Sequence, residues 1–446
     1  MDFYLPRIAD TLLEAKGAVL IQGPQMVWKD HDGKKTANSV LEMDRPDMTK
    51  QYQDMAELSP LRLLEGDTPR LIDEWQIAPN LWNAVRYEVD RRDKFGQFIL
   101  TGSAVPAEID ASMHTGTGRI SKLYMRTMSL YESKDSRGEV SLGDLFKGRH
   151  ISAEDDTRLE KIAFLLCRGG WPKAVGLDER PALFQAMDYV DAIVSTDISR
   201  VDSTRRDKEK AKRLLRSYAR TIGTQRSLET IRQDMLANHS DTFDASTLYS
   251  YIDALTKMFV IEDAPAWNPN VRSKTAIRTT DTRYFTDPSI ATAALGIGPA
   301  DLLDDLKTMG FMFENLCIRD LRIYADYLDG NLYHYRDKNG LECDAVIHLR
   351  NGSYGLIEIK LGGDSAIEEG AENLKRLASK IDTKKMKAPS FMLSCAPERR
   401  TPTRGKTVSM WLPSPAWGRD TGLVEEWLWQ FLLIIAPPVG FHDLPP

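Results

Sequence analysis

The chain has 446 residues, of which 42% are hydrophobic and 28% are charged, an ordinary globular balance that allows two or three packed domains. A formal net charge of -6 argues against a surface coated for DNA, although local basic patches are compatible with it.

The cysteines and two segments near the ends of the sequence indicate in which cellular compartment the protein is expected. The cysteines are widely spaced, with no CxxC pair and no histidine at metal spacing, which predicts reduced thiols and no structural zinc: Cys167, Cys317, Cys343 and Cys395. Residues 1–16 carry acids in an amphipathic pattern rather than a signal-peptide core. The apolar run 427–437 is interrupted by Gln430 and is too short to cross about 30 Å of hydrocarbon. We therefore expect a soluble, cytoplasmic protein without a membrane partner.

The first predicted strand, residues 18–22, runs into Gly23, which is the setting of a phosphate loop. Counting the pattern G-x-x-x-x-G-K-[ST] from Gly23 puts Lys29 in register. However, Trp28 stands where the second glycine lets backbone approach phosphate, and Asp30 stands in place of the hydroxyl.

A second candidate for the phosphate loop follows at Gly33, Lys34 and Thr36. It keeps the Gly-Lys pair but places the hydroxyl one residue late and lengthens the loop by about five residues relative to the pattern. For both candidates the alternative is a plain surface loop that contains lysines.

A strand, helix and strand come next. The segment 69–76 has Leu71 and Ile72 directly before two acids, and the segment 97–103 is another short apolar strand with a polar tip. Between them, apolar side chains of residues 80–92 recur at helical spacing. This is the pattern of a βαβ crossover, so both polar tips should lie at the carboxyl edge of a parallel sheet, where such sheets bind ligands.

These tips carry the first set of candidate catalytic residues. In a P-loop ATPase, Asp73 would be the carboxylate on the Mg²⁺ side and Glu74 would be the base that polarises water. Thr101 or Ser103 would be the sensor of the γ-phosphate. The alternative is that the acids begin a solvated loop and cap the next helix. Arg119, after a glycine-containing loop, is a candidate γ-phosphate contact in cis or from a neighbouring subunit, or else a structural arginine.

Several segments together resemble the prokaryotic AAA-superfamily ATP-binding proteins that carry an uncharacterised C-terminal domain. The resemblance covers nearly the whole chain and rests on residues 5–7, 23–24, 63–66, 69–76, 98–103, 116–120 and 128–132. It implies ATP and Mg²⁺ as cofactors and matches Lys29 to the family's phosphate-loop lysine. The family's neighbouring glycine and threonine are absent, which predicts weakened hydrolysis on a retained fold.

Residues 157–220 read as successive helices broken at residues 168–172, and they resemble the helical lid of AAA proteins. Arg168 is either a lid-side nucleotide contact or a structural arginine. The basic run 205–220 is first of all a solvated helix face, because Asp207 and Glu209 dilute its charge.

The next segment suggests a winged helix. Two short helices begin at Ser227 and Asp244, and residues 259–261 and 283–285 form a predicted two-stranded ribbon. In that reading the wing cations that meet DNA phosphates are Arg272, Lys274 and Arg278. The alternative is a winged helix that only packs domains together.

The last domain offers a second chemical site. Strands 341–347 and 354–360 bring Asp344 towards Glu358 and Lys360, and two carboxylates with a lysine can bind Mg²⁺ and orient water for phosphodiester cleavage. The arrangement resembles the PD-(D/E)xK nuclease core, with Glu314 matching its preceding helix acid. A nuclease fold that has decayed to a binding role is the alternative.

We therefore predict an α/β protein with an AAA-type P-loop domain (1–138), a helical lid (139–220), a winged-helix-like domain (221–300) and a nuclease-like domain (301–446). The predicted function is ATP binding with impaired hydrolysis, coupled to nucleic acid or a protein partner. A nonhydrolysing DNA-binding or scaffold protein and a Mg²⁺-dependent nuclease regulated by the ATPase domain are the alternatives. Oligomerisation is compatible with each of them.

Overall fold

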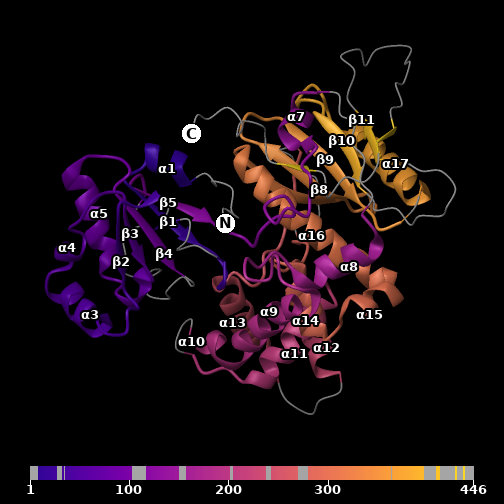
Figure 1. Ribbon diagram of the computed structural model, residues 1–446. Coiled ribbons are helices and arrows are strands. Elements are labelled where there is room, and N and C mark those ends of the chain that lie inside the picture. Colours follow the sequence, from indigo (N-terminus) through magenta and orange to yellow (C-terminus); the bar gives the residue numbers. More distant parts are fainter. Residues whose placement is uncertain are drawn as a thin grey trace.

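A computed structural model describes residues 9–27, 33–34, 36–102, 117–149, 157–200, 204–237, 243–269, 280–362 and 364–395, and the backbone of residues 408–411, 427–428 and 435–436. A parallel sheet with its helices lies at one side of the molecule, a second sheet lies at the other, and a helical region lies beside and below the second sheet in Figure 1. Within the described residues no helix is long and apolar enough to cross a membrane.

The N-terminal sheet has five strands in the order β2-β3-β4-β1-β5, and all its pairings are parallel. Its strands are β1 (Ala18–Gln22), β2 (Ser39–Glu42), β3 (Arg70–Asp73), β4 (Phe98–Gly102) and β5 (Ile120–Tyr124). Both faces of β1 and β4 are buried, as expected of central strands in a sheet with helices on its two sides. The predicted strand, helix and strand are confirmed.

Helices of this unit are α1 (Ala9–Ala15), α3 (Thr49–Leu58), α4 (Pro60–Leu63) and α5 (Leu81–Arg92), with a 3₁₀ turn η1 (Trp75–Ile77). The helix α5 buries Leu81, Val85 and Val89 against the sheet in the same cluster as Phe98. It ends at Asp93, whose backbone is left-handed. These three side chains are the ones whose spacing predicted the helix.

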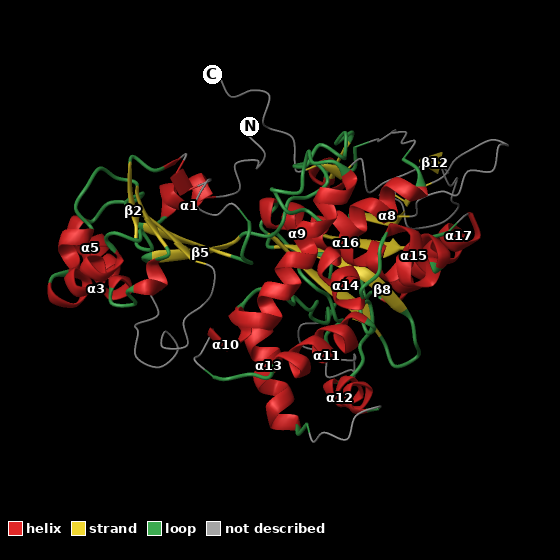
Figure 2. Cartoon of the chain, turned by 60° about the horizontal axis from the view of Figure 1, so that its bottom comes forward, coloured by secondary structure: helices red, strands yellow, loops and turns green. Residues whose placement is uncertain are grey.

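The middle of the chain is helical, as predicted. It contains β6 (Val140–Ser141), α7 (Leu142–Phe146), α8 (Leu159–Arg168), α9 (Glu179–Ala192), a π turn η2 (Ile193–Asp197), α10 (Ile198–Arg200), α11 (Lys208–Ala219), α12 (Leu228–Leu236), α13 (Ala245–Lys257), α14 (Pro288–Leu295) and α15 (Pro299–Asp304). Figure 2 shows α11, α12 and α13 gathered away from the N-terminal sheet. Ser227 and Asp244 cap α12 and α13 through their side chains, as residues that begin helices do.

The predicted ribbon of residues 259–261 and 283–285 is present as antiparallel backbone pairing, although the two segments do not form regular strands. The structure has only isolated bridges there, Ile261 with Phe285 and Ala264 with Thr282. Phe259 has a positive φ of 59°, and Pro265 has no N–H to extend a ladder, so regular pairing stops on both sides.

The C-terminal unit is a six-stranded mixed sheet in the order β12-β11-β10-β9-β8-β7. Its elements are α16 (Leu306–Tyr327), β7 (Gly330–Arg336), β8 (Glu342–Leu349), β9 (Tyr354–Ile359), α17 (Asp364–Lys380), β10 (Phe391–Cys395), β11 (Val408–Trp411) and β12 (Trp427–Leu428). A further strand, β13 (Ile435–Ala436), pairs with β6. The helix α17 connects the parallel pair β9 and β10, and the two predicted strands are present as β8 and β9, with β7 between them and α16.

The units share one core. A single buried cluster runs from Val19 and Ile99 of the first sheet through Trp171 and Leu214 to Ile357 of the second. The side chains of Cys167, Cys317 and Cys343 are buried as reduced thiols. Because the core is continuous, a side chain of one unit can complete a site on another.

Candidate functional site

The carboxyl edge of the first sheet brings two predicted site residues together. The Thr101 hydroxyl donates to Asp73 Oδ1 at 2.6 Å, and the backbone N–H of Glu74 donates to the same oxygen at 3.1 Å. Parallel pairing of β3 with β4 ends both strands at one edge, which is why residues 28 positions apart meet. The predicted proximity of the two tips is confirmed.

Glu74 leaves the strand through a left-handed backbone, with φ 51° and ψ 42°. Its carboxylate accepts a hydrogen bond from the Gln76 side chain. Gly102, at the tip of β4, has no room for a side chain, because a Cβ there would lie 2.4 Å from Gln76 Oε1. The strand tips are thus packed tightly around the two acids. Ser103, the other predicted sensor, lies outside the described residues.

Gly23 directly follows β1 at this same edge. A Cβ on Gly23 would lie 2.0 Å from the carbonyl oxygen of Met125, so the backbone of the residue after β5 abuts the start of the predicted phosphate loop. Trp28, Lys29 and Asp30 lie outside the described residues.

In the second candidate for the phosphate loop, the side chains of Lys34 and Thr36 contact carboxylates. Gly33 and Lys34 are helical, and Lys34 Nζ lies 2.8 Å from Glu42 Oε1 in an ion pair that lowers the pKa of Glu42. The Thr36 hydroxyl donates to Asp10 Oδ1 at 3.1 Å. A Cβ on Gly33 would lie 2.9 Å from the Leu71 side chain, so this glycine packs on the face of the sheet.

Arg119 lies at the opposite edge of the sheet. It directly precedes β5, and its carbonyl accepts a hydrogen bond from Ala18 at the start of β1. Its guanidinium pairs with Asp90 Oδ1 at 2.8 Å on the surface. Since the five residues of β1 separate the two edges, about 16 Å of strand, the structure does not bring Arg119 to Asp73 within one chain.

The candidate site of the C-terminal unit is assembled as predicted from β8 and the end of β9. Lys360 Nζ lies 2.9 Å from Glu358 Oε1 and 3.4 Å from Asp344 Oδ2. The backbone N–H of Ile359 also donates to Asp344 Oδ2, at 2.7 Å. Antiparallel pairing of the two strands therefore holds an ammonium group between two carboxylates.

Glu314 of α16 completes this group. Its carboxylate accepts a hydrogen bond from the hydroxyl of Tyr284, a fully buried residue of the middle region. Burial, and then the charge of Asp344, raise the pKa of Glu314 well above its usual range. The same two causes raise the pKa of Glu358 to about 8.

Asp344 and Glu358 are residue types that can contribute to a Mg²⁺ site, and the Lys360 ammonium lies between them. Glu358 is fully buried, and among the described residues no hydrogen-bond donor satisfies its oxygens apart from the Lys360 ammonium that lies beside them. Mg²⁺ in proteins uses one or two carboxylates with water and phosphate oxygens as its other ligands. No cluster of three or more His, Cys, Asp or Glu side chains arranged for a metal occurs in the described part of the chain.

Sequence reasoning missed the contacts that connect the units. Arg126, 8% exposed, lies 2.6 Å from Glu262 and 2.6 Å from Asp326, which belong to the middle region and to α16. The sequence pattern likewise marked Tyr284 only as part of a ribbon. These contacts span 30 to 200 positions, and no local pattern marks them. Arg168 is buried and pairs with Asp135 at 2.7 Å. These contacts favour the second of its two predicted roles, that of a structural arginine.

The residues predicted to be wing cations, Arg272, Lys274 and Arg278, lie outside the described residues.

Three family models match separate parts of the chain. Residues 25–134 match an AAA domain family, residues 159–301 match a domain of unknown function (DUF8612), and residues 309–412 match another domain of unknown function (DUF4143). The match of residues 25–134 to an AAA domain family agrees with the parallel α/β sheet found there and with its acidic edge.

Relatives and solved structures are distant. Uncharacterised proteins of Mycobacterium bovis and Mycobacterium tuberculosis are each 22% identical over 349 residues, 77% of this chain and 70% of theirs. The Walker-type ATPase of Pyrococcus abyssi has a TM-score of 0.39 at 15% identity, over 64% of this chain and 93% of that one. DnaA of Aquifex aeolicus, bound to AMPPCP, has a TM-score of 0.26 at 13% identity, over 56% and 84%.

Proposed function

We propose that the protein binds ATP with Mg²⁺ at the carboxyl edge of the first sheet, hydrolyses it weakly, and couples binding to nucleic acid or a protein partner. The observation that carries this is the hydrogen bond of Thr101 to Asp73 beside the strand that leads into Gly23. When bound, Mg²⁺ would supply charge stabilisation to the phosphates.

The departures of the loop from the pattern support weak hydrolysis. Asp30 places a negative charge where a hydroxyl normally reaches the metal, and Trp28 replaces a glycine. The Lys34 and Thr36 side chains already have carboxylate partners. Lys29 is therefore the cation proposed to meet phosphate, Asp73 the metal-side carboxylate and Glu74 the base.

Calorimetry of ATP with Mg²⁺ tests this on the natural chain and on a repaired loop, Trp28→Gly with Asp30→Thr. We expect the natural chain to bind ATP, Lys29→Ala to weaken binding at least tenfold, and the repaired loop to hydrolyse ATP faster. Thr36→Ala is the matched control and should bind like the natural chain. If only the repaired loop binds ATP, the first domain is a scaffold and the proposal fails.

A second candidate function is Mg²⁺-dependent phosphodiester cleavage at the C-terminal site. The buried Glu358 carboxylate, which lies beside Asp344 and pairs with Lys360, favours it. In this role Asp344 and Glu358 would hold the metal, Lys360 would orient water, and Mg²⁺ would activate the phosphate.

Cleavage of a labelled oligonucleotide with and without Mg²⁺ tests this second function. Activity should be lost in Asp344→Asn and retained in Asp337→Asn, a change at another acid near the same sheet. Binding without cleavage in every variant would instead favour a decayed nuclease fold that acts as a binding module or scaffold.

A further inference from the structure

Four cations form a stripe along α11 and its C-cap: Lys208, Lys212, Arg216 and Arg220. They recur every fourth residue, so they share one face about 6 Å apart along the axis. All four are exposed, while the opposite face buries Leu214, Leu215 and Tyr218 in the core. We call these four residues the α11 stripe.

The α11 stripe contributes little to the stability of the fold. Like charges four residues apart oppose helix formation, and within the described residues only Arg220 of the stripe has a carboxylate partner, Asp234 at 3.0 Å. Of the nearby acids, Asp207 is engaged as the N-cap of α11, and Glu209 is exposed on the same helix. The stripe therefore presents a net positive surface on a chain that is acidic overall.

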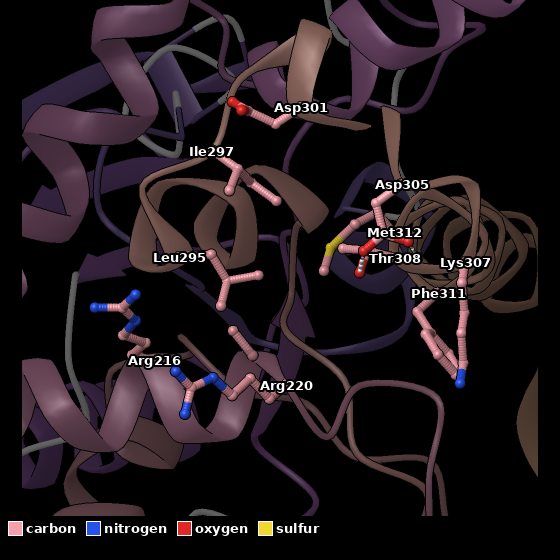
Figure 3. Close-up of a pocket in the computed structure, with 11 residues that line it drawn as sticks. Arg216, Arg220, Leu295, Ile297, Asp301, Asp305, Lys307, Thr308, Phe311 and Met312 are labelled. Atoms are coloured by element: carbon pink, nitrogen blue, oxygen red, sulfur yellow. Dashed lines mark hydrogen bonds between the residues drawn. The ribbon is translucent and has the colours of Figure 1, made fainter. Parts of the chain in front are cut away.

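A cavity of about 580 Å³ lies at the C-terminal end of the stripe, between α11 and the start of α16 (Figure 3). Arg216 and Arg220 line it from α11, and Lys307 and Phe311 line it from α16. The cavity also has two acids, Asp301 and Asp305. Each carboxylate already caps a helix: Asp301 accepts from Gly298 N–H at 2.8 Å, and Asp305 accepts from the Thr308 hydroxyl at 2.6 Å.

The cavity adjoins the carboxylate group of the C-terminal unit. Phe311 and Glu314 are three residues apart on α16, about one turn. Gly223, with a positive φ of 68°, packs against both of them, since a Cβ there would lie 2.9 Å from the Phe311 ring and 3.1 Å from the Glu314 carboxylate. Glu314 itself does not line the cavity; it is connected to it through Phe311 and Gly223.

We propose that the α11 stripe and this cavity bind a single strand of nucleic acid, with phosphates along the stripe and an unpaired base against Phe311. A row of cations that ends at a partly exposed aromatic ring is how single strands are held without sequence preference. This inference names the partner class that the proposed function leaves open, and it rests on that function only for coupling to ATP.

The test is fluorescence anisotropy of a labelled 12-nucleotide DNA strand with the full chain, without ATP, from 50 to 200 mM salt. Lys212→Gln with Arg216→Gln should weaken binding at least tenfold at low salt. It should also lower the slope of log K against log salt by about 1.4, roughly 0.7 for each phosphate that the variant no longer neutralises. Phe311→Leu should weaken binding without changing the slope.

The matched control is Lys173→Gln with Arg180→Gln, which removes two exposed cations from another part of the surface. It should leave affinity and slope unchanged. Equal effects of the two double variants, tighter binding of duplex than of single strand, or no binding by the natural chain would each overturn the proposal. Because ATP is absent, these outcomes are independent of the calorimetric test of nucleotide binding.

Discussion

His334 shows how one buried side chain links two parts of the chain. Its Nε2 lies 3.0 Å from the carbonyl oxygen of Thr280, and its Nδ1 lies 3.4 Å from the Gln225 amide nitrogen. A neutral ring with the proton on Nε2 satisfies both partners, since Nε2–H donates to the carbonyl and Nδ1 accepts from the amide. Burial lowers the pKa of His334 to about 4.

This lowered pKa predicts an acid-sensitive fold. An unfolded chain protonates His334 below about pH 6.5, whereas the folded chain resists protonation to about pH 4, so stability is full above pH 6.5 and is lost as the pH falls between these values. The total loss is about 3 kcal/mol. Urea unfolding at pH 7, 5.5 and 4 should show a smaller decline in His334→Gln. Parallel declines in both proteins would contradict the assignment.

Two glycines at the end of α8 determine how that helix meets its neighbours. A Cβ on Gly169 would lie 2.4 Å from Asp287 Oδ1, and one on Gly170 would lie 2.1 Å from the Met128 carbonyl oxygen. Gly170 also accepts a backbone hydrogen bond from Met128 N–H and donates one to Asp287 Oδ2. The break that the sequence placed at residues 168–172 is therefore a close contact between three chain segments.

Gly170→Ala should destabilise the protein by about 1–3 kcal/mol or more, because the clash is with backbone that cannot yield. Gly310→Ala is the contrasting change. It lies within α16, where among the described residues a Cβ would meet only Leu361, at an ordinary 3.5 Å, and it should stabilise the protein by about 0.5–1 kcal/mol. Chemical denaturation measures both, and a result of opposite sign at either glycine would show that the local packing differs.

At the scale of the whole molecule, Arg126 holds the units together. It follows β5 next to Gly23, where the predicted phosphate loop begins, and pairs with Glu262 and Asp326. Burial by itself would raise the pKa of Glu262, but the charges of Arg126 and Arg322 hold it below its usual range. The start of the loop at Gly23 abuts Met125, the residue before this anchor to α16, which is the helix that carries Glu314.

Arg126→Met should destabilise the chain by about 3 kcal/mol, because it leaves Glu262 largely buried with only Arg322, at 3.5 Å, as a cationic partner among the described residues. The double change Arg126→Met with Glu262→Gln should recover much of that loss. Calorimetric unfolding measures the stability of both variants. Equal stability of the single and double variants would mean that the pair is not coupled.

The sequence by itself determined the strands β1, β3 and β4 of the first sheet, the buried face of α5, the helix starts at Ser227 and Asp244, and the meeting of Asp73 with Thr101. Each follows from local periodicity, a capping side chain or the fixed register of a parallel pair. The group of Asp344, Glu358 and Lys360 was also predictable, since two adjacent strands supply it.

Only the tertiary structure decided which charges meet across the units. It put Arg119 at the far edge of the sheet, paired Arg126 with acids 136 and 200 positions away, and placed Tyr284 on Glu314. Such pairs depend on how whole units pack, and the sequence carries no period or spacing that encodes them. The α11 stripe lies between these cases: its spacing is visible in the sequence, but the cavity at its end exists only because α16 packs beside it.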